Sequence, residues 1–197
     1  PEGLRAALIA MQRSAVMGYP VWASDIGGYH GGFFRETTMR WLGFGCFSPI
    51  MEVGPTRNRG FWNLEHEPIH DTTLIATWRL YAKTRMKLIP YLKTLAEEAN
   101  RSGTPIVRPL FLEYSEQTEA WNDWQTFLLG TDILVSVIWE AGRKEQNVYL
   151  PGGDTWIDAW EPDKSYRGGG YIKVLAEPYK TPIFIRKGSQ INLGDLN

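Results

Sequence analysis

Hydrophobic positions recur at helical spacing through the first hundred residues of the chain and at strand-like spacing through its last third. Three stretches have the helical period, namely residues 1–17, 35–47 and 72–102. Gly18 follows the first stretch as a helix terminator, whereas Asp71 and Gly103 flank the third as N-cap and C-terminal stop. The pattern therefore predicts three helices.

Compact apolar runs between and after these helices predict strands. YPVWAS is such a run, and it ends at Asp25, before a pair of glycines. Residues 104–114 predict a buried strand, and residues 116–130 predict a short helix with Trp121, Trp124 and Leu128 facing the core. Helix and strand thus alternate in this part of the chain, as in an α/β protein.

The pattern changes at Thr131. From there on, the chain contains short strand-like runs separated by turn signals such as PGGD and RGGG, at the spacing of an antiparallel β-sandwich. We therefore expect two parts, an α/β part at residues 1–130 and an all-β part at residues 131–197, the second of them incomplete.

Composition narrows the class of protein without identifying it. The chain has 197 residues, 43% of them hydrophobic, so it can bury a core, and its formal net charge is −1. Neither nucleic acid nor a membrane is an expected partner, because no basic excess is present and no apolar run reaches the ~18 residues of a membrane span. The single cysteine, Cys46, excludes an intrachain disulfide. The sequence has no phosphate-loop, dinucleotide-binding or serine-hydrolase motif, so no cofactor is expected.

Asp25 is the first candidate for chemistry because it follows a strand. In a (β/α) barrel, functional side chains lie at the carboxyl ends of the strands. The segment 48–70, rich in proline and glycine, has the length typical of a functional loop. The alternative is structural: the Asp25 carboxylate would cap a turn by accepting hydrogen bonds from the amides of the following glycines. Position alone leaves both interpretations open.

A second candidate is HEPIH at residues 66–70, which matches the H-E-x-x-H pattern of zinc peptidases. That pattern works when both histidines lie one helical turn apart. Pro68 disfavours a helix there by about 3 kcal/mol, and His30 is the only other histidine. No metal site is therefore expected.

Seven short motifs follow one another in an order that is similar to that of a known enzyme family. They are DIGGY at 25–29, RW at 40–41, PIVRPLF at 105–111, LLGTDILVS at 128–136, VYLP at 148–151, W-x-DAW at 156–160 and PIFIRKGS at 182–189. The chain thereby resembles glycoside hydrolase family 31, which includes α-glucosidases, α-xylosidases and sulfoquinovosidases. The resemblance implies the C-terminal part of a (β/α)8 TIM barrel followed by a C-terminal antiparallel β-sandwich.

The same resemblance implies a retaining α-glycosidase that acts on an α-glucoside or α-xyloside. Such enzymes use a nucleophile and an acid/base, two carboxylates about 5–5.5 Å apart. The family's motifs for both aspartates precede DIGG and are not found in this sequence. We therefore expect a C-terminal fragment without its own catalytic residues, whose partners are the remainder of its barrel and an oligosaccharide or glycoside. The cellular compartment is not indicated.

By the resemblance, several residues of this chain form the wall and the support of a sugar pocket. Asp25 and Tyr29 are expected to line the pocket. Arg40, Trp41 and Arg108 are expected to give structural support, Arg108 as a buried ion-pair partner in the eighth barrel strand.

One departure from the family concerns the contacts to the sugar. The family usually has Arg-x-His about 27 to 29 residues after the DIGG aspartate, where this chain has Glu52 and Gly54. Glycine has no side chain for a hydroxyl, so Glu52 and the loop residues Arg57 and Trp62 become the candidates for substrate binding. The sugar itself stays open.

A different class of function is a non-catalytic carbohydrate-binding or structural module. In that case Trp156, Trp160 and Tyr171 would form an exposed row for stacking on sugars. Burial of the two tryptophans would count against such a module.

Overall fold

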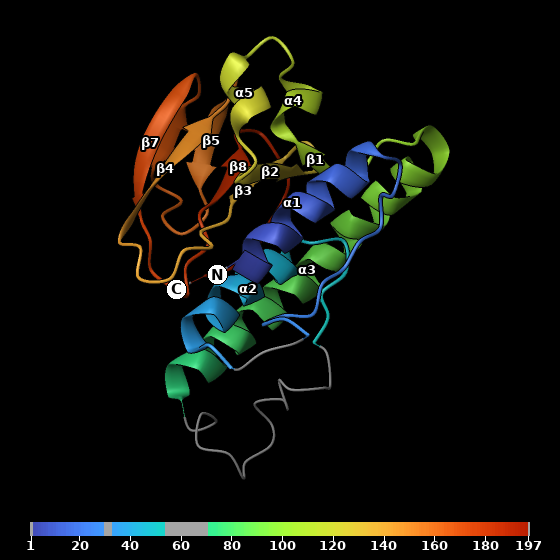
Figure 1. Cartoon of the computed structure of the whole chain (residues 1–197). Coiled ribbons are helices and arrows are strands. Elements are labelled where there is room, and N and C mark those ends of the chain that lie inside the picture. Colours follow the sequence, from blue (N-terminus) through green and yellow to red (C-terminus); the bar gives the residue numbers. More distant parts are fainter. Residues whose placement is uncertain (1, 30–32, 54–70, 197) are drawn as a thin grey trace.

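The computed structural model describes residues 2–29, 33–53 and 71–196, and it places helices in the first half of the chain and antiparallel strands in the second (Figure 1). This combination of helices and antiparallel sheet fits the expected partial barrel followed by a β-domain.

Three long helices carry the first half. They are α1 (Glu2–Val16), α2 (Arg35–Cys46) and α3 (Thr72–Ser102), and α2 packs against α3 with α1 beside them (Figure 1). The Asp71 side chain accepts hydrogen bonds from the amides of Thr73 and Leu74, and Gly103 ends α3 with φ 75°. The predicted caps are thus confirmed. Within the described ranges, none of the helices has the length and apolar character needed to cross a membrane.

Two antiparallel sheets form the second half. The larger has the order β1-β2-β3-β8-β5-β6, and β4 pairs with β7 in the smaller. Their bounds are β1 (Val107–Pro109), β2 (Thr126–Leu129), β3 (Ile133–Ser136), β4 (Glu145–Leu150), β5 (Thr155–Asp158), β6 (Ser165–Arg167), β7 (Gly170–Leu175) and β8 (Ile183–Arg186). Buried side chains of both sheets, among them Leu134, Val148 and Trp156, share one hydrophobic cluster.

The prediction of one strand at residues 104–114 was wrong. Only β1 is a strand; it pairs antiparallel with β2, whereas strands of a (β/α) barrel are parallel, and Pro109 ends it before the short helix α4 (Leu110–Glu113). Proline has no amide hydrogen for the ladder, so the strand stops there. Arg108 therefore lies in the antiparallel sheet and not in a barrel strand.

Residues 116–130 also differ from the prediction of one helix. The helix α5 (Thr118–Asn122) is short, and the Asp123 carboxylate accepts hydrogen bonds from the amides of Gln125 and Thr126. This turn redirects the chain into β2, whose four residues are all buried. Trp121 is 52% exposed rather than inward.

One hydrophobic core joins the helices to the larger sheet. Leu8 of α1, Phe44 of α2 and Phe127 of β2 belong to the same cluster of buried side chains, and the rings of Phe44 and Phe127 meet edge to face with centroids 6.4 Å apart. The helical and β parts therefore pack as neighbours without a gap of polar residues. The division at residue 130 stays a prediction.

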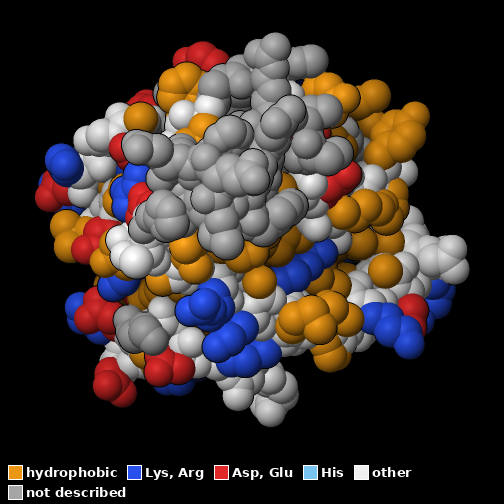
Figure 2. All heavy atoms as spheres, turned by 90° about the horizontal axis from the view of Figure 1, so that it is seen from below, with side chains coloured by type: hydrophobic (Ala, Val, Ile, Leu, Met, Phe, Trp, Pro, Cys, Tyr) orange, Lys and Arg blue, Asp and Glu red, His pale blue; other side chains and the backbone are white. Residues whose placement is uncertain are grey.

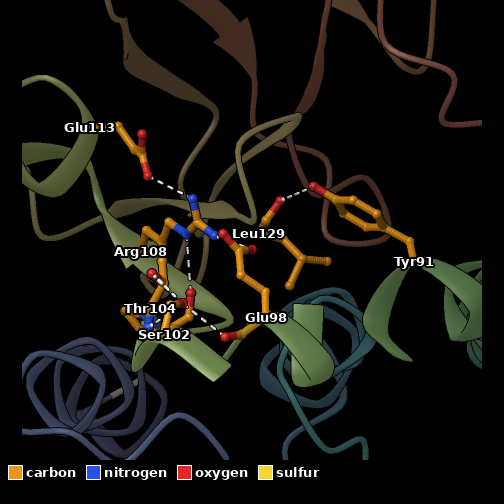
Figure 3. Close-up of polar contacts among 8 residues, drawn as sticks. Tyr91, Glu98, Ser102, Thr104, Arg108, Glu113 and Leu129 are labelled. Carbon is orange, nitrogen blue, oxygen red and sulfur yellow. Dashed lines mark hydrogen bonds and ion pairs between the residues drawn. The ribbon is translucent and has the colours of Figure 1, made fainter. Parts of the chain in front are cut away.

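Arg108 adds a polar link between α3, β1 and α4. Its guanidinium donates to the carboxylates of Glu98 (2.8 Å) and Glu113 (2.7 Å), which are labelled in Figure 3. It also donates to the carbonyl of Pro105 (3.1 Å). Next to it, the hydroxyl of Tyr91 donates to the carbonyl of Leu129. The Arg108 side chain is only 4% exposed, so its charge depends on these partners.

Candidate functional site

The candidate site is built where two extended segments meet side by side. Asp25 and Glu52 form an isolated parallel β-bridge, in which the amide of Ile26 donates to the carbonyl of Glu52 (3.0 Å). Further back, the amide of Ile50 donates to the carbonyl of Trp22 (3.3 Å). Parallel neighbours of this kind are what adjacent strands of a barrel form. YPVWAS was predicted to be a strand, but the described pairing is limited to these few bonds.

A glycine turn follows Asp25 directly. The amide of Gly28 donates to the carbonyl of Asp25 (2.9 Å), and Gly27 and Gly28 have φ values of 86° and 91°. Residues with a Cβ rarely adopt such values, so the backbone geometry of the turn requires glycine at both positions. The Asp25 side chain is half-buried. The turn thus holds the Asp25 carboxylate at the end of a strand-like segment. This position is compatible both with a functional side chain and with a cap of the turn.

Helix α2 contacts the residues on both sides of Asp25. Ile26 is buried, and a Cβ on Gly45 of α2 would approach its Cδ1 to 2.9 Å. The indole of Trp41, also on α2, donates to the hydroxyl of Ser24 at 2.9 Å. Ser24 and Ile26, the two neighbours of Asp25, therefore both pack against α2. The hydrogen bond from Trp41 to Ser24 helps to position Asp25.

Arg40 makes its contacts elsewhere. It is buried, binds Glu36 within α2 through two nitrogens (2.7 and 3.0 Å) and donates to the carbonyl of Ala176 beyond β7 (2.9 Å). Although burial opposes it, the hydrogen bonds from Arg40 and from the amide of Gly142 hold the pKa of Glu36 below its ordinary value. Arg40 therefore ties α2 to the β-domain, and Arg108 ties α3 to it. Within the described part of the chain, neither forms a hydrogen bond or ion pair with Asp25 or Glu52.

Arg85 is a positioning residue that the sequence analysis missed. Its guanidinium donates to the carbonyls of Cys46 (2.9 Å), Ser48 and Pro49 (2.6 Å), the residues that lead from α2 towards Glu52. Burial lowers the pKa of Arg85. The sequence does contain one signal for such a role. Arg85 follows the buried Tyr81 by four residues and so lies on the apolar face of α3.

The remaining predicted contacts lie partly outside the described residues. Tyr29 is 51% exposed, and Glu52 is exposed as well. Gly54, Arg57 and Trp62 lie outside the described residues. So do all three histidines, His30, His66 and His70. In the described residues, His, Cys, Asp and Glu form no group of three that could hold a metal ion.

The tryptophans proposed for a binding module are buried. Trp156 is fully buried, and Trp160 is 7% exposed with its indole donating to the carbonyl of Thr181 (2.7 Å). Only Tyr171 of the three is exposed. An exposed stacking row of these three residues is therefore not formed, which counts against the module.

Comparison with known proteins connects this geometry to a family. Residues 1–95 match the model of the glycosyl hydrolases family 31 TIM-barrel domain, and residues 103–191 match that of the glycosyl hydrolase family 31 C-terminal domain. The chain belongs to glycoside hydrolase family 31. The two matches follow each other along the chain in the order that the motifs implied, so the family and the fold class expected from them are confirmed.

Individual members of family 31 match over nearly the whole chain. The sulfoquinovosidase of Agrobacterium fabrum is 33% identical over 95% of this chain and 28% of its own length. Alpha-glucosidase 2 of Bacillus thermoamyloliquefaciens is 30% identical over 99% of this chain and 24% of its own length. The chain therefore spans about a quarter of the length of these curated relatives.

Solved structures of family 31 enzymes superpose on the chain. A soil-metagenome α-xylosidase complexed with xylose has a TM-score of 0.84 at 28% identity, over 93% of this chain and 30% of its own. A sulfoquinovosidase from E. rectale with an aza-sugar inhibitor has a TM-score of 0.84 at 31% identity, over 95% of this chain and 28% of its own. Family 31 enzymes with different named substrates thus share this architecture.

Proposed function

We propose that this chain is the C-terminal part of a retaining α-glycosidase that hydrolyses an α-glucoside or α-xyloside, and that Asp25 lines its sugar pocket. The observation that carries the proposal is the parallel bridge between Asp25 and Glu52, followed by the turn at Gly27 and Gly28. It holds a half-buried carboxylate at the end of a strand-like segment, where barrel enzymes keep their functional side chains. Membership of family 31 supports the reaction class.

In this proposal the chain recognises the sugar and leaves bond cleavage to residues that precede DIGG in the family. The nucleophile and the acid/base would be two aspartates about 5–5.5 Å apart. Asp25 would accept hydrogen bonds from sugar hydroxyls, and Glu52 would offer a second acceptor beside it. Tyr29, Arg57 and Trp62 would complete the wall. Arg40, Trp41 and Arg108 would support it from behind.

Exposed apolar side chains near the site fit a partner that is the remainder of the barrel. Large hydrophobic residues between α1 and α2 are exposed by 48–74%: Val16, Met17, Tyr19, Val21, Tyr29 and Phe34. Hydrophobic side chains also lie among Lys and Arg side chains on the face drawn in Figure 2. Where exposed apolar side chains form one surface, that surface usually marks an interaction site. In this proposal, we expect the preceding barrel segments to cover the residues between α1 and α2.

The test is Asp25→Asn in the complete hydrolase. Losing one charge-assisted hydrogen bond in the pocket should lower kcat/KM for an aryl α-glycoside about ten- to a hundredfold. The melting temperature should change little, because in this proposal the carboxylate faces the pocket and does not hold the turn. Asp163→Asn, an exposed carboxylate of the β-domain, is the matched control. Near-normal activity together with a lowered melting temperature would mean that Asp25 only caps the turn.

The chain alone provides the second test. Because both catalytic aspartates are expected from preceding segments, the purified chain should not hydrolyse aryl α-glycosides. Turnover that co-purifies with the chain and is lost in Asp25→Asn would contradict this account of where the catalytic carboxylates lie.

A further inference from the structure

A groove of about 500 Å³ lies where α1 meets the β-domain. Arg5 and Arg13 line it from α1, Trp124 and Trp139 line it from loops before β2 and after β3, and Tyr171 lines it from β7. It shares no residue with the bridge between Asp25 and Glu52. Its volume is within the range of small-molecule binding sites.

The aromatic rings of the groove are held in place by α1. The guanidinium carbons of Arg5 and Arg13 each lie 5.8 Å from the centre of an indole ring, that of Trp139 and that of Trp124 respectively. In addition, the buried Gln12 of α1 donates from Nε2 to the carbonyl of Trp124 (2.8 Å). Such cation–π contacts fix the orientation of ring and guanidinium together, so the groove has preformed apolar platforms.

Polar groups in the groove are available to a ligand. In the part of the chain that the structure describes, the side-chain amides of Gln125 and Asn147 make no hydrogen bond, and Arg5 and Arg13 have no ion-pair partner. Asn147 of β4 lies on the same face as Tyr171 of β7, because Tyr149 is opposite Tyr171 in the ladder. The smaller sheet therefore presents an amide and an exposed ring side by side.

The mixture of donors and acceptors indicates the class of ligand. Guanidinium groups only donate, whereas the side-chain amides of Gln125 and Asn147 both donate and accept. The Asp123 carboxylate also lines the groove, but its Oδ1 already accepts from the amides of Gln125 and Thr126. A phosphate or another small anion would use the donors and leave the acceptors unmatched. A sugar matches all of them, because each hydroxyl donates and accepts and the faces of its ring pack on aromatic side chains.

We propose that this groove binds a neutral oligosaccharide, as a second carbohydrate site contributed by α1 and the β-domain. The inference goes beyond the proposed function and does not rest on it, because the residues that line the groove include neither Asp25 nor Glu52. It requires only that the exposed ring of Tyr171, the amide of Asn147 and the indole of Trp139 face one ligand.

The experiment is calorimetric titration of the purified chain with maltohexaose, a neutral α-linked glucan. Tyr171→Ala and Asn147→Ala should each raise the Kd by about threefold or more, the effect of one lost contact or hydrogen bond. Both residues are exposed, so the fold should survive, and unchanged melting temperatures would verify this. Tyr19→Ala is the matched control, since Tyr19 is 63% exposed, close to the 61% of Tyr171, but lies outside the groove.

Three results would overturn the proposal. One is no binding of maltohexaose at millimolar concentration. Another is an equal loss of affinity in Tyr19→Ala. The last is preferential binding of an acidic oligosaccharide such as oligogalacturonate that disappears with added salt, which would assign the groove to anions. Asp25→Asn should leave this binding unchanged, so failure of the groove and failure of the proposed hydrolase can be told apart.

Discussion

Replacing Arg108 by methionine should destabilise the chain far more than replacing an exposed arginine. Arg108→Met keeps the aliphatic stem and removes the guanidinium, which is 4% exposed and donates to Glu98, Glu113 and the carbonyl of Pro105. The variant leaves two carboxylates and one carbonyl without their donor. The three contacts join α3, β1 and α4, so the loss falls on the junction between the helices and the larger sheet.

The expected magnitude follows from how far each group can return to water. Breaking a fully buried ion pair typically costs about 3–5 kcal/mol. Here the side chains of Glu98 and Glu113 are 36% and 28% exposed, so water can solvate them in part after the change. The variant also no longer has to desolvate a guanidinium. We therefore expect a loss of about 2–3 kcal/mol in the free energy of unfolding, less than for a fully buried pair.

Urea denaturation followed by tryptophan fluorescence measures this loss. Arg143→Met is the matched control, because Arg143 pairs with Glu140 at the surface, with side chains 37% and 51% exposed. Exposed pairs contribute about 0–1 kcal/mol, so the control should lose less than that. Equal losses for the two variants, with unchanged denaturant slopes, would refute the argument that burial makes Arg108 important.

Three further predictions concern the helices. Gly43→Ala should cost about 1–3 kcal/mol, seen as a lowered urea midpoint, because the new Cβ would lie 1.7 Å from the hydroxyl oxygen of Thr181; an unchanged midpoint would contradict it. Tyr81→Phe should lower the melting temperature and cost about 1–3 kcal/mol, since its buried hydroxyl donates to a carbonyl and accepts from the amide of Thr181, both at 2.9 Å. The Arg35 guanidinium, opposed by some burial, lowers the pKa of Asp71 from its ordinary 3.8 to about 2, so the stabilisation from this carboxylate is present above about pH 4 and is lost as the pH falls towards 2. The stability difference between the wild type and Asp71→Asn, measured in urea at pH 5, 3 and 2, should shrink over that window and would argue against this assignment if it stayed constant.

The sequence predicted the helices well because their signals are local. For α3, all of these signals lie within one continuous segment: the Asp71 cap, the Gly103 stop and the apolar period between them. The predictions for residues 104–114 and 116–130 failed because the structure there depends on partners that are distant in the sequence. Whether Val107–Pro109 joins a parallel barrel or an antiparallel sheet depends on β2, its partner in space. Short apolar runs fit a helix and a strand equally well, and the tertiary partner decides.

The candidate site shows the same limit. Asp25 could be singled out by its place after a strand-like run, and the glycine pair by the turn that it forms. That Glu52 lies opposite Asp25 is a contact between segments 27 positions apart, which no local pattern contains. Arg85 was missed because a lone arginine on a helix usually points to solvent, whereas this one binds three carbonyls of another segment.

The way in which Arg85 holds that segment bears on how the protein can change over evolution. Its guanidinium binds main-chain oxygens of Cys46, Ser48 and Pro49, which every amino acid supplies, and no side chain of the stretch that follows. Substitutions in the stretch up to Glu52 can therefore alter what faces a ligand while the backbone keeps its course. Selection can thus exchange the residues next to Asp25 one at a time, without first finding a compensating change in α3.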